Sequence, residues 1–207
     1  MSLSNELTAE EFFRQFKNKL YDQNAVDEEK RSYRETYLSN EHYTNLINRH
    51  IVPDILKQFG MDYSNEYYRI DVTGWVNDTN KELGDEFSNA QFNYHSWRLK
   101  VAFEHENNST DWSDEVIKLL YVNCPLKIVV GYNYANNRNA LQFGDERKLD
   151  LLARTITHLG VEIKDEFMII LGNCGEGYKE ENEAEKYFGY RAYLYDSDSK
   201  SFKPLGI

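Results

Sequence analysis

The run Leu126 to Tyr132 is the segment that most constrains the fold of this chain. It follows Pro125 and is short, nearly all apolar and rich in β-branched residues. Such a run is typical of a parallel strand that is buried on both faces. A helical apolar stripe that includes Trp112 and Val116 precedes it, and the stretch 97–107 begins as a strand before that. Strand, helix and strand in this order predict a crossover unit, which we expect to be right-handed.

The first half of the chain adds two helices and one strand. Thr8 to Tyr21 carries a capping-box pattern at its start and apolar residues at helical spacing. A second helix is expected to begin at Ser39-Asn40 and to end at Gly60, where glycine is a natural stop. Residues 67–73 alternate as a strand, and residues 77–96 are predicted to be a long connection.

The second half is expected to complete the sheet. Asp145 is predicted to cap a helix that ends at Gly160, and residues 166–171 form another buried strand. Residues 188–195 alternate as a last strand, along which 201–205 returns as an edge. We therefore expect one α/β domain over 1–207, a three-layer-type sandwich with a mixed central sheet. Its helical part covers 7–60, and its sheet core with crossover helices covers 66–205.

The charge of the chain limits its partners. The 207 residues carry a formal net charge of −11, and the sequence pI is about 5.0. This argues against broad non-specific binding of nucleic acid, but it allows a local basic groove or a divalent cation among carboxylates. No apolar run is long enough to span a bilayer and no signal-peptide pattern is present, so we expect a cytoplasmic protein without a membrane partner. The oligomeric state stays open, and a homodimer is one of the alternatives.

Three carboxylates are placed where two strands could bring them together. Side chains alternate across a strand with period two, so Glu104 and Glu106 share one face at the end of the stretch 97–107. The same alternation predicts an opposite, apolar face that contains Trp97, Leu99, Val101, Phe103 and His105. Asp71 lies in the preceding strand, and an antiparallel pairing would bring it close to both glutamates.

These acidic side chains have two interpretations. Hard cations such as Mg²⁺ take oxygen ligands, usually one or two carboxylates with water and substrate phosphate, and a bound ion can activate water. The other interpretation is a solvated strand end, where Arg69, Arg98 or Lys118 pairs with the glutamates. His105 is expected to be a packed histidine on the apolar face.

Two lysines could act beside such an ion. Lys118 lies on the helix that follows the strand, and Lys100 lies on the same strand face as Glu104. Lys100 is the weaker candidate, because four strand residues place it roughly 13 Å from Glu104. A lysine here would position the attacking water and offset developing negative charge.

From about Tyr67 to Tyr132, the order of elements and these residues resemble the PD-(D/E)XK nuclease superfamily, which has the restriction endonuclease-like fold. There an Asp and a Glu bind the metal ion, and a Lys after the Glu assists the attacking water. The resemblance implies that Asp71 and Glu104 bind Mg²⁺ or Mn²⁺, with the backbone carbonyl of His105 completing the shell. Glu106 stands in the usual Lys position, which gives Glu-x-Glu. Some members of the superfamily resemble this, with a Glu at that position or with the lysine moved to the following helix, where Lys118 stands.

Two functions follow as alternatives. The first is a metal-dependent nuclease-like phosphodiesterase that acts on nucleic acid. In it Asp71 and Glu104 bind the ion, Glu106 supports the ion or orients water, and Lys118 supplies positive charge. The second is a non-catalytic protein of the same fold that serves as an acidic binding or interaction module, as the missing motif lysine and the net charge of −11 suggest.

Overall fold

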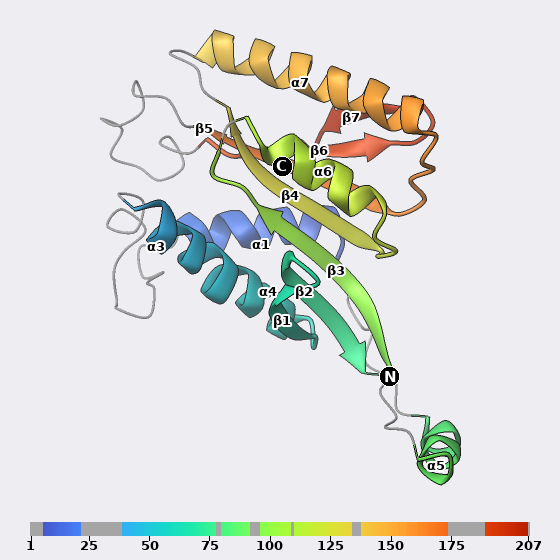
Figure 1. Ribbon diagram of the computed structural model, residues 1–207. Helices are drawn as coiled ribbons and strands as arrows, with labels where there is room; N and C mark the ends of the chain where they lie inside the picture. Colours follow the sequence, from blue (N-terminus) through green and yellow to red (C-terminus); the bar gives the residue numbers. More distant parts are fainter. Residues whose placement is uncertain are drawn as a thin grey trace.

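The computed structural model describes residues 6–21, 39–77, 80–91, 96–108, 110–133, 138–173 and 189–206, without the side chains of 138–143. It is an α/β structure built on one seven-stranded sheet (Figure 1). The strands are β1 (Asp62–Tyr67), β2 (Ile70–Asn77), β3 (Trp97–His105), β4 (Leu126–Asn133), β5 (Glu166–Asn173), β6 (Arg191–Asp196) and β7 (Ser201–Pro204). The helices are α1 (Ala9–Tyr21), α3 (Asn40–Asn45), the π-helix η1 (Leu46–Ile51), α4 (Val52–Gln58), α5 (Lys81–Asn89), α6 (Trp112–Leu120) and α7 (Arg138–Leu159).

The strands lie in the sheet in their order along the chain, from β1 to β7. The pairs β3–β4 and β4–β5 are parallel, and the other neighbouring pairs are antiparallel. The predicted mixed sheet and the strand–helix–strand unit around α6 are therefore confirmed. Because parallel neighbours need a crossover connection, α6 and α7 pass over one face of the sheet to join β3, β4 and β5.

Helices cover both faces and create two cores (Figure 1). On one face α1, α3, η1 and α4 pack against the sheet, and their core includes Phe12, Phe16, Leu56, Phe103 and Ile128. On the other face α6 and α7 pack against Ala102, Val129 and Ile169. This three-layer arrangement explains why β4 is buried along its whole length, as the continuous apolar run predicts.

Several local predictions are confirmed. Helix α1 begins at Ala9, one residue after the predicted cap Thr8, whose Oγ1 accepts a hydrogen bond from the backbone N–H of Glu11. Ser39 caps α3, since its hydroxyl accepts from the backbone N–H of His42. The edge hairpin of β6 and β7 also forms as expected. No helix in the described part of the chain combines the length and apolarity needed to span a bilayer.

Other predictions are wrong. The connection 77–96 contains a helix, α5, which projects from the sheet beyond β2 and β3 and buries none of its side chains (Figure 1). Strand β1 lies before the predicted strand and pairs with it through a two-residue turn. Asp145 does not cap a helix: α7 begins at Arg138, and Asp145 is fully buried within it. The predicted start of the last strand, at Phe188, lies outside the described residues.

A β-bulge in β3 changes which side chains share a face. Gly74 of β2 pairs with Val101, but Trp75 pairs with Leu99, so β3 has one extra residue at this point. As a result Leu99 packs on the α6 side of the sheet, whereas Val101 belongs to the core on the α1 side. The predicted common face of Trp97, Leu99, Val101, Phe103 and His105 is therefore wrong for its first two members.

Candidate functional site

Asp71 and Glu104 lie side by side at one end of the β2–β3 pair. The register that pairs Val72 with Phe103 places Asp71 opposite Glu104. Asp71 Oδ2 accepts a hydrogen bond of 2.8 Å from the backbone N–H of His105, which holds its carboxylate against β3. The antiparallel pairing therefore brings two of the three predicted carboxylates together.

Glu104 is an almost completely buried carboxylate. Only 2% of the residue is exposed, and its neighbours on the same face include Ala102 and Val129. Burial raises the pKa of Glu104 to about 8; the nearby charges of Asp71 and Glu115 add to this rise, and Lys118 opposes it. Burial also raises the pKa of Asp71, against the hydrogen bonds that it accepts.

Lys118 is the cation at this site. Its Nζ lies 2.6 Å from Glu104 Oε1, donates a hydrogen bond of 2.9 Å to the carbonyl oxygen of Arg69, and forms an ion pair with Glu115. Burial acts to lower the pKa of Lys118, but Glu104 and Glu115 outweigh this and raise it. Lys100 does not lie at this site, because its Nζ is 4.0 Å from a carboxylate oxygen of Glu6.

Lys118 partly compensates the burial of Glu104. Its Nζ lies 2.6 Å from Glu104 Oε1, and this hydrogen-bonding contact opposes the rise in the pKa of Glu104. A buried carboxylate is costly unless a cation stands close to it. Glu104 and Asp71 therefore form a pair of adjacent acidic side chains, both with raised pKa values, beside one lysine.

His105 is a packed histidine, as expected. Only 6% of it is exposed, and its Nε2 shares a hydrogen bond of 2.9 Å with the Tyr132 hydroxyl. Its ring also contacts Tyr43 edge-on. Burial lowers the pKa of His105 to about 3, so the side chain stays neutral near neutral pH. His105 acts on the site through its backbone, which binds Asp71.

Glu106 does not join the other two carboxylates, which corrects the prediction that three converge. Strand β3 ends at His105, although the backbone N–H of Glu106 still donates a hydrogen bond of 3.0 Å to the carbonyl oxygen of Val130. Glu106 Oε1 instead accepts a hydrogen bond of 2.7 Å from the backbone N–H of Asn108. Among the described residues, no three or more His, Cys, Asp or Glu side chains are grouped so that they could hold a metal ion.

Glu115 and Asn48 also belong to the site, and neither was predicted from the sequence. Glu115, in the first turn of α6, pairs with Lys118 and acts on the charge of Glu104 and Asp71. Its spacing of one helical turn from Lys118 is a sequence signal that could have found it. Asn48 belongs to η1 and donates a side-chain hydrogen bond that opposes the rise in the pKa of Asp71. Asn48 lies far from Asp71 along the chain, so no local sequence pattern indicated that the two residues would be in contact.

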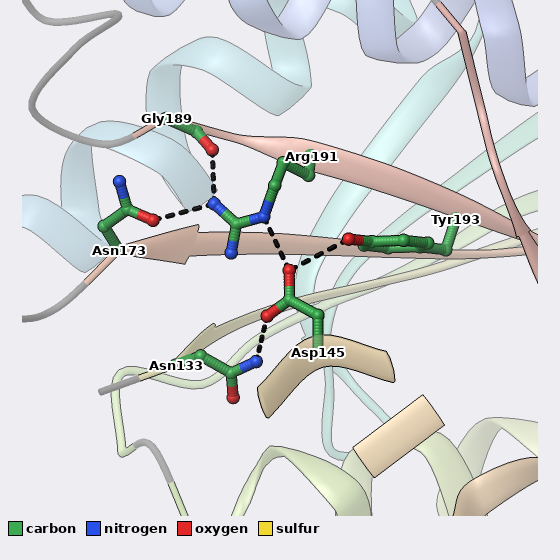
Figure 2. A network of polar contacts seen from close by, with 6 residues as sticks. All are labelled: Asn133, Asp145, Asn173, Gly189, Arg191 and Tyr193. Atoms are coloured by element: carbon green, nitrogen blue, oxygen red, sulfur yellow. Dashed lines mark hydrogen bonds and ion pairs between the residues drawn. The ribbon is translucent and has the colours of Figure 1, made fainter. Parts of the chain in front are cut away.

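A second buried carboxylate lies at the carboxyl ends of β4 and β5 (Figure 2). Asp145 Oδ2 accepts from Arg191 Nε at 2.5 Å and from the Tyr193 hydroxyl at 2.9 Å. Its other oxygen accepts from the side-chain amide of Asn133. Arg191 also donates 2.7 Å to Asn173 Oδ1 and 2.6 Å to the carbonyl of Gly189. We call this group the Asp145–Arg191 network; it ties α7, β4, β5 and β6 together.

The residues at Asp71 and Glu104 fit a hard divalent cation. Both offer carboxylate oxygens, and Mg²⁺ in proteins commonly has one or two carboxylate ligands, with water filling the remaining positions. Lys118 Nζ lies 2.6 Å from Glu104 Oε1, so a cation bound here would share this carboxylate with the lysine. The Asp145–Arg191 network does not fit such an ion, because each Asp145 oxygen already accepts from a neighbour.

Comparisons with known proteins give no independent indication of function. No family model matches the chain, and neither a curated protein nor a solved structure matches it.

Proposed function

We propose that this chain is a Mg²⁺- or Mn²⁺-dependent phosphodiesterase of the restriction endonuclease-like fold, acting on nucleic acid. One observation carries the proposal. Lys118 Nζ, from the helix after β3, lies 2.6 Å from the buried Glu104 carboxylate, and Asp71 lies opposite Glu104 on the neighbouring strand. An acid from each of two adjacent strands and a lysine beside them are the groups that metal-assisted phosphodiester hydrolysis needs.

In this proposal Asp71 and Glu104 hold the cation, with the backbone carbonyl of His105 as a further ligand. The cation supplies Lewis-acid stabilisation and lowers the pKa of bound water. Lys118 orients the attacking water or offsets negative charge on the phosphoryl oxygens. Glu115 positions Lys118 through their ion pair. Lys118 thereby takes the role of the lysine that the motif usually carries where this chain has Glu106.

The electrostatics of the site supports this assignment. Two adjacent carboxylates whose pKa values are raised by burial gain from a nearby positive charge. Strongly perturbed carboxylates with a specific charge partner are also more frequent at functional sites than elsewhere. The hydrogen bond from Lys118 Nζ to the Arg69 carbonyl oxygen would hold the lysine in place when Asp71 and Glu104 bind a metal ion.

The test is a cleavage assay at pH 8 with single- and double-stranded DNA and RNA, with Mg²⁺ or Mn²⁺. We expect cleavage by the unaltered chain and a loss of at least about 100-fold in Glu104→Gln and in Lys118→Met. The matched controls are Glu162→Gln and Lys164→Met, which alter an exposed ion pair of 3.2 Å elsewhere. Equal background cleavage in all five proteins would rule out the enzyme.

The second candidate function is an acidic, non-catalytic binding module. The net charge of −11 and the pairing of Lys118 with Glu104 favour it. Calorimetric titration with Mn²⁺ separates the two functions. Binding that disappears in Asp71→Ala supports the metal-dependent enzyme, whereas no binding by the unaltered chain supports the module.

A further inference from the structure

Four aromatic side chains form a continuous chain of ring contacts on β1, β2, β3 and the turn between β1 and β2. The ring centroids of Tyr68 and Tyr67 lie 4.6 Å apart, those of Tyr67 and Trp97 lie 5.6 Å apart, and those of Trp97 and Trp75 lie 5.8 Å apart. Tyr68 is 81% exposed and Trp97 is 39% exposed, and the other two rings are half-buried. We call these four residues the aromatic platform.

The aromatic platform shares a sheet face with the candidate site. The bulge in β3 turns Trp97 and Leu99 to the side that carries α6, and Trp75 stands opposite Leu99 in the pairing. The other end of the platform is Tyr68, which directly precedes Arg69. The carbonyl oxygen of Arg69 accepts the hydrogen bond from Lys118. The platform therefore extends from the edge of the site that contains Asp71 and Glu104.

The turn between β1 and β2 adds a cation to this surface. Tyr68 and Arg69 both have positive φ, of 52° and 63°, in a two-residue hairpin turn where Asn-Gly or Gly-Gly is usual. Larger side chains at such positions cost free energy, and this kind of strain is often associated with function. The Arg69 side chain is exposed and makes no ion pair or hydrogen bond with any of the described residues.

We propose that the aromatic platform, together with Arg69, binds a single-stranded nucleic acid and leads its backbone towards Asp71 and Glu104. This proposal rests on the proposed function and names its substrate class. Unpaired bases stack on exposed aromatic rings without regard to sequence. Bases within a duplex are already stacked on their neighbours, so a duplex gains little from these rings. Arg69 would contact a phosphate between the platform and the site.

The affinity for the single strand should depend only weakly on salt concentration. Single strands lose affinity with salt in proportion to the phosphates neutralised, with a logarithmic slope of about −0.7 for each contact. Arg69 and Lys118 are the cations next to the platform end of the site. We therefore expect a shallow slope, between about −0.7 and −1.4, because stacking supplies most of the affinity.

The experiment measures binding without catalysis, in EDTA, by fluorescence anisotropy of a labelled oligothymidylate of about 15 nucleotides. The unaltered chain should bind it more tightly than a duplex of equal length. Tyr68→Gly should weaken binding at least about fivefold without lowering stability, since glycine accepts positive φ freely. Trp97→Ala should weaken it similarly. Lys200→Gly is the matched control, because Lys200 has a φ of 50° in the distant β6–β7 turn.

The outcomes separate this proposal from the enzyme proposal. Binding of the single strand without any cleavage under metal retains the platform and rejects the enzyme. Cleavage of duplex DNA without oligothymidylate binding rejects the platform and retains the enzyme. Equal affinity for single strand and duplex, or binding by both platform variants as tight as that of Lys200→Gly, also overturns the platform.

Discussion

Glu104 and Asp145 are both almost completely buried, but the groups that surround their carboxylates differ. Glu104 is 2% exposed and Asp145 is 0% exposed. Asp145 accepts hydrogen bonds from an arginine, a tyrosine and an asparagine. Glu104 has one lysine beside it, shared with Glu115, and a second carboxylate, Asp71, across the strand pair.

The two carboxylates differ in how their burial is compensated. Each oxygen of Asp145 accepts a hydrogen bond, so the carboxylate holds four elements together and has little capacity left to bind a ligand. Glu104 has Lys118 Nζ at 2.6 Å from its Oε1, and its pKa is about 8. Strongly perturbed carboxylates with a specific charge partner are more frequent at functional sites than elsewhere, and for this reason the proposed function uses Glu104 and not Asp145.

The largest expected effect is at Asp145. Asp145→Ala would leave Arg191 without its carboxylate and with a partly buried, uncompensated charge. We expect a loss of about 3–5 kcal/mol in the free energy of unfolding, measured by urea denaturation. A loss below about 1 kcal/mol would mean that Asp145 and Glu104 do not differ in the way described.

Glu104→Gln should have the opposite sign. The folded-state pKa of Glu104 is about 8, above an unfolded value of about 4.3. The folded state therefore binds more protons between these pH values, and stability falls as the pH rises through this window. At pH 8 the neutral variant should be more stable than the unaltered chain by about 1 kcal/mol or more, and the gain should shrink towards pH 5. A variant that is less stable at pH 8 contradicts this.

A divalent metal ion should stabilise the chain through Glu104 and not through Asp145. If Asp71 and Glu104 bind Mn²⁺, the unaltered chain at pH 8 gains about 1.4 kcal/mol at ten times the dissociation constant. Differential scanning calorimetry should show the gain in the unaltered chain and in Tyr193→Phe, which alters only the Asp145–Arg191 network. The gain should be absent in Glu104→Gln. Its presence there would move the metal site away from Glu104.

The smallest expected effect comes from Tyr193→Phe. It removes one of the donors to Asp145 while Arg191 and Asn133 keep theirs. We expect a loss of about 0.5–1.5 kcal/mol in the free energy of unfolding, the usual net value of one hydrogen bond. Denaturation with urea at pH 7 measures it. A loss as large as that of Asp145→Ala would show that the network fails as a unit.

Most of the fold follows from local signals. Helix α1 and the strand–helix–strand unit around α6 come from apolar spacing and capping residues, which act within a few positions of the chain. Helix α5 was missed because residues 77–96 are rich in Asn, Asp, Gly and Ser, which are typical of loops, although Leu83 and Phe87 lie one helical turn apart. The position of Asp145 inside α7 was also hidden, because an acidic residue near a helical pattern resembles a cap.

The sequence by itself determined the α/β class, the parallel pairing of β3 with β4, and the candidates Asp71, Glu104 and Lys118, because period-two and helical patterns are local. Only the tertiary structure decided that Glu115 replaces Glu106 in the charge cluster, that the bulge turns Trp97 to the α6 side, and that Asp145 pairs with Arg191. Each of these depends on the register between distant segments, and a shift of one residue in a strand moves a side chain to the opposite face.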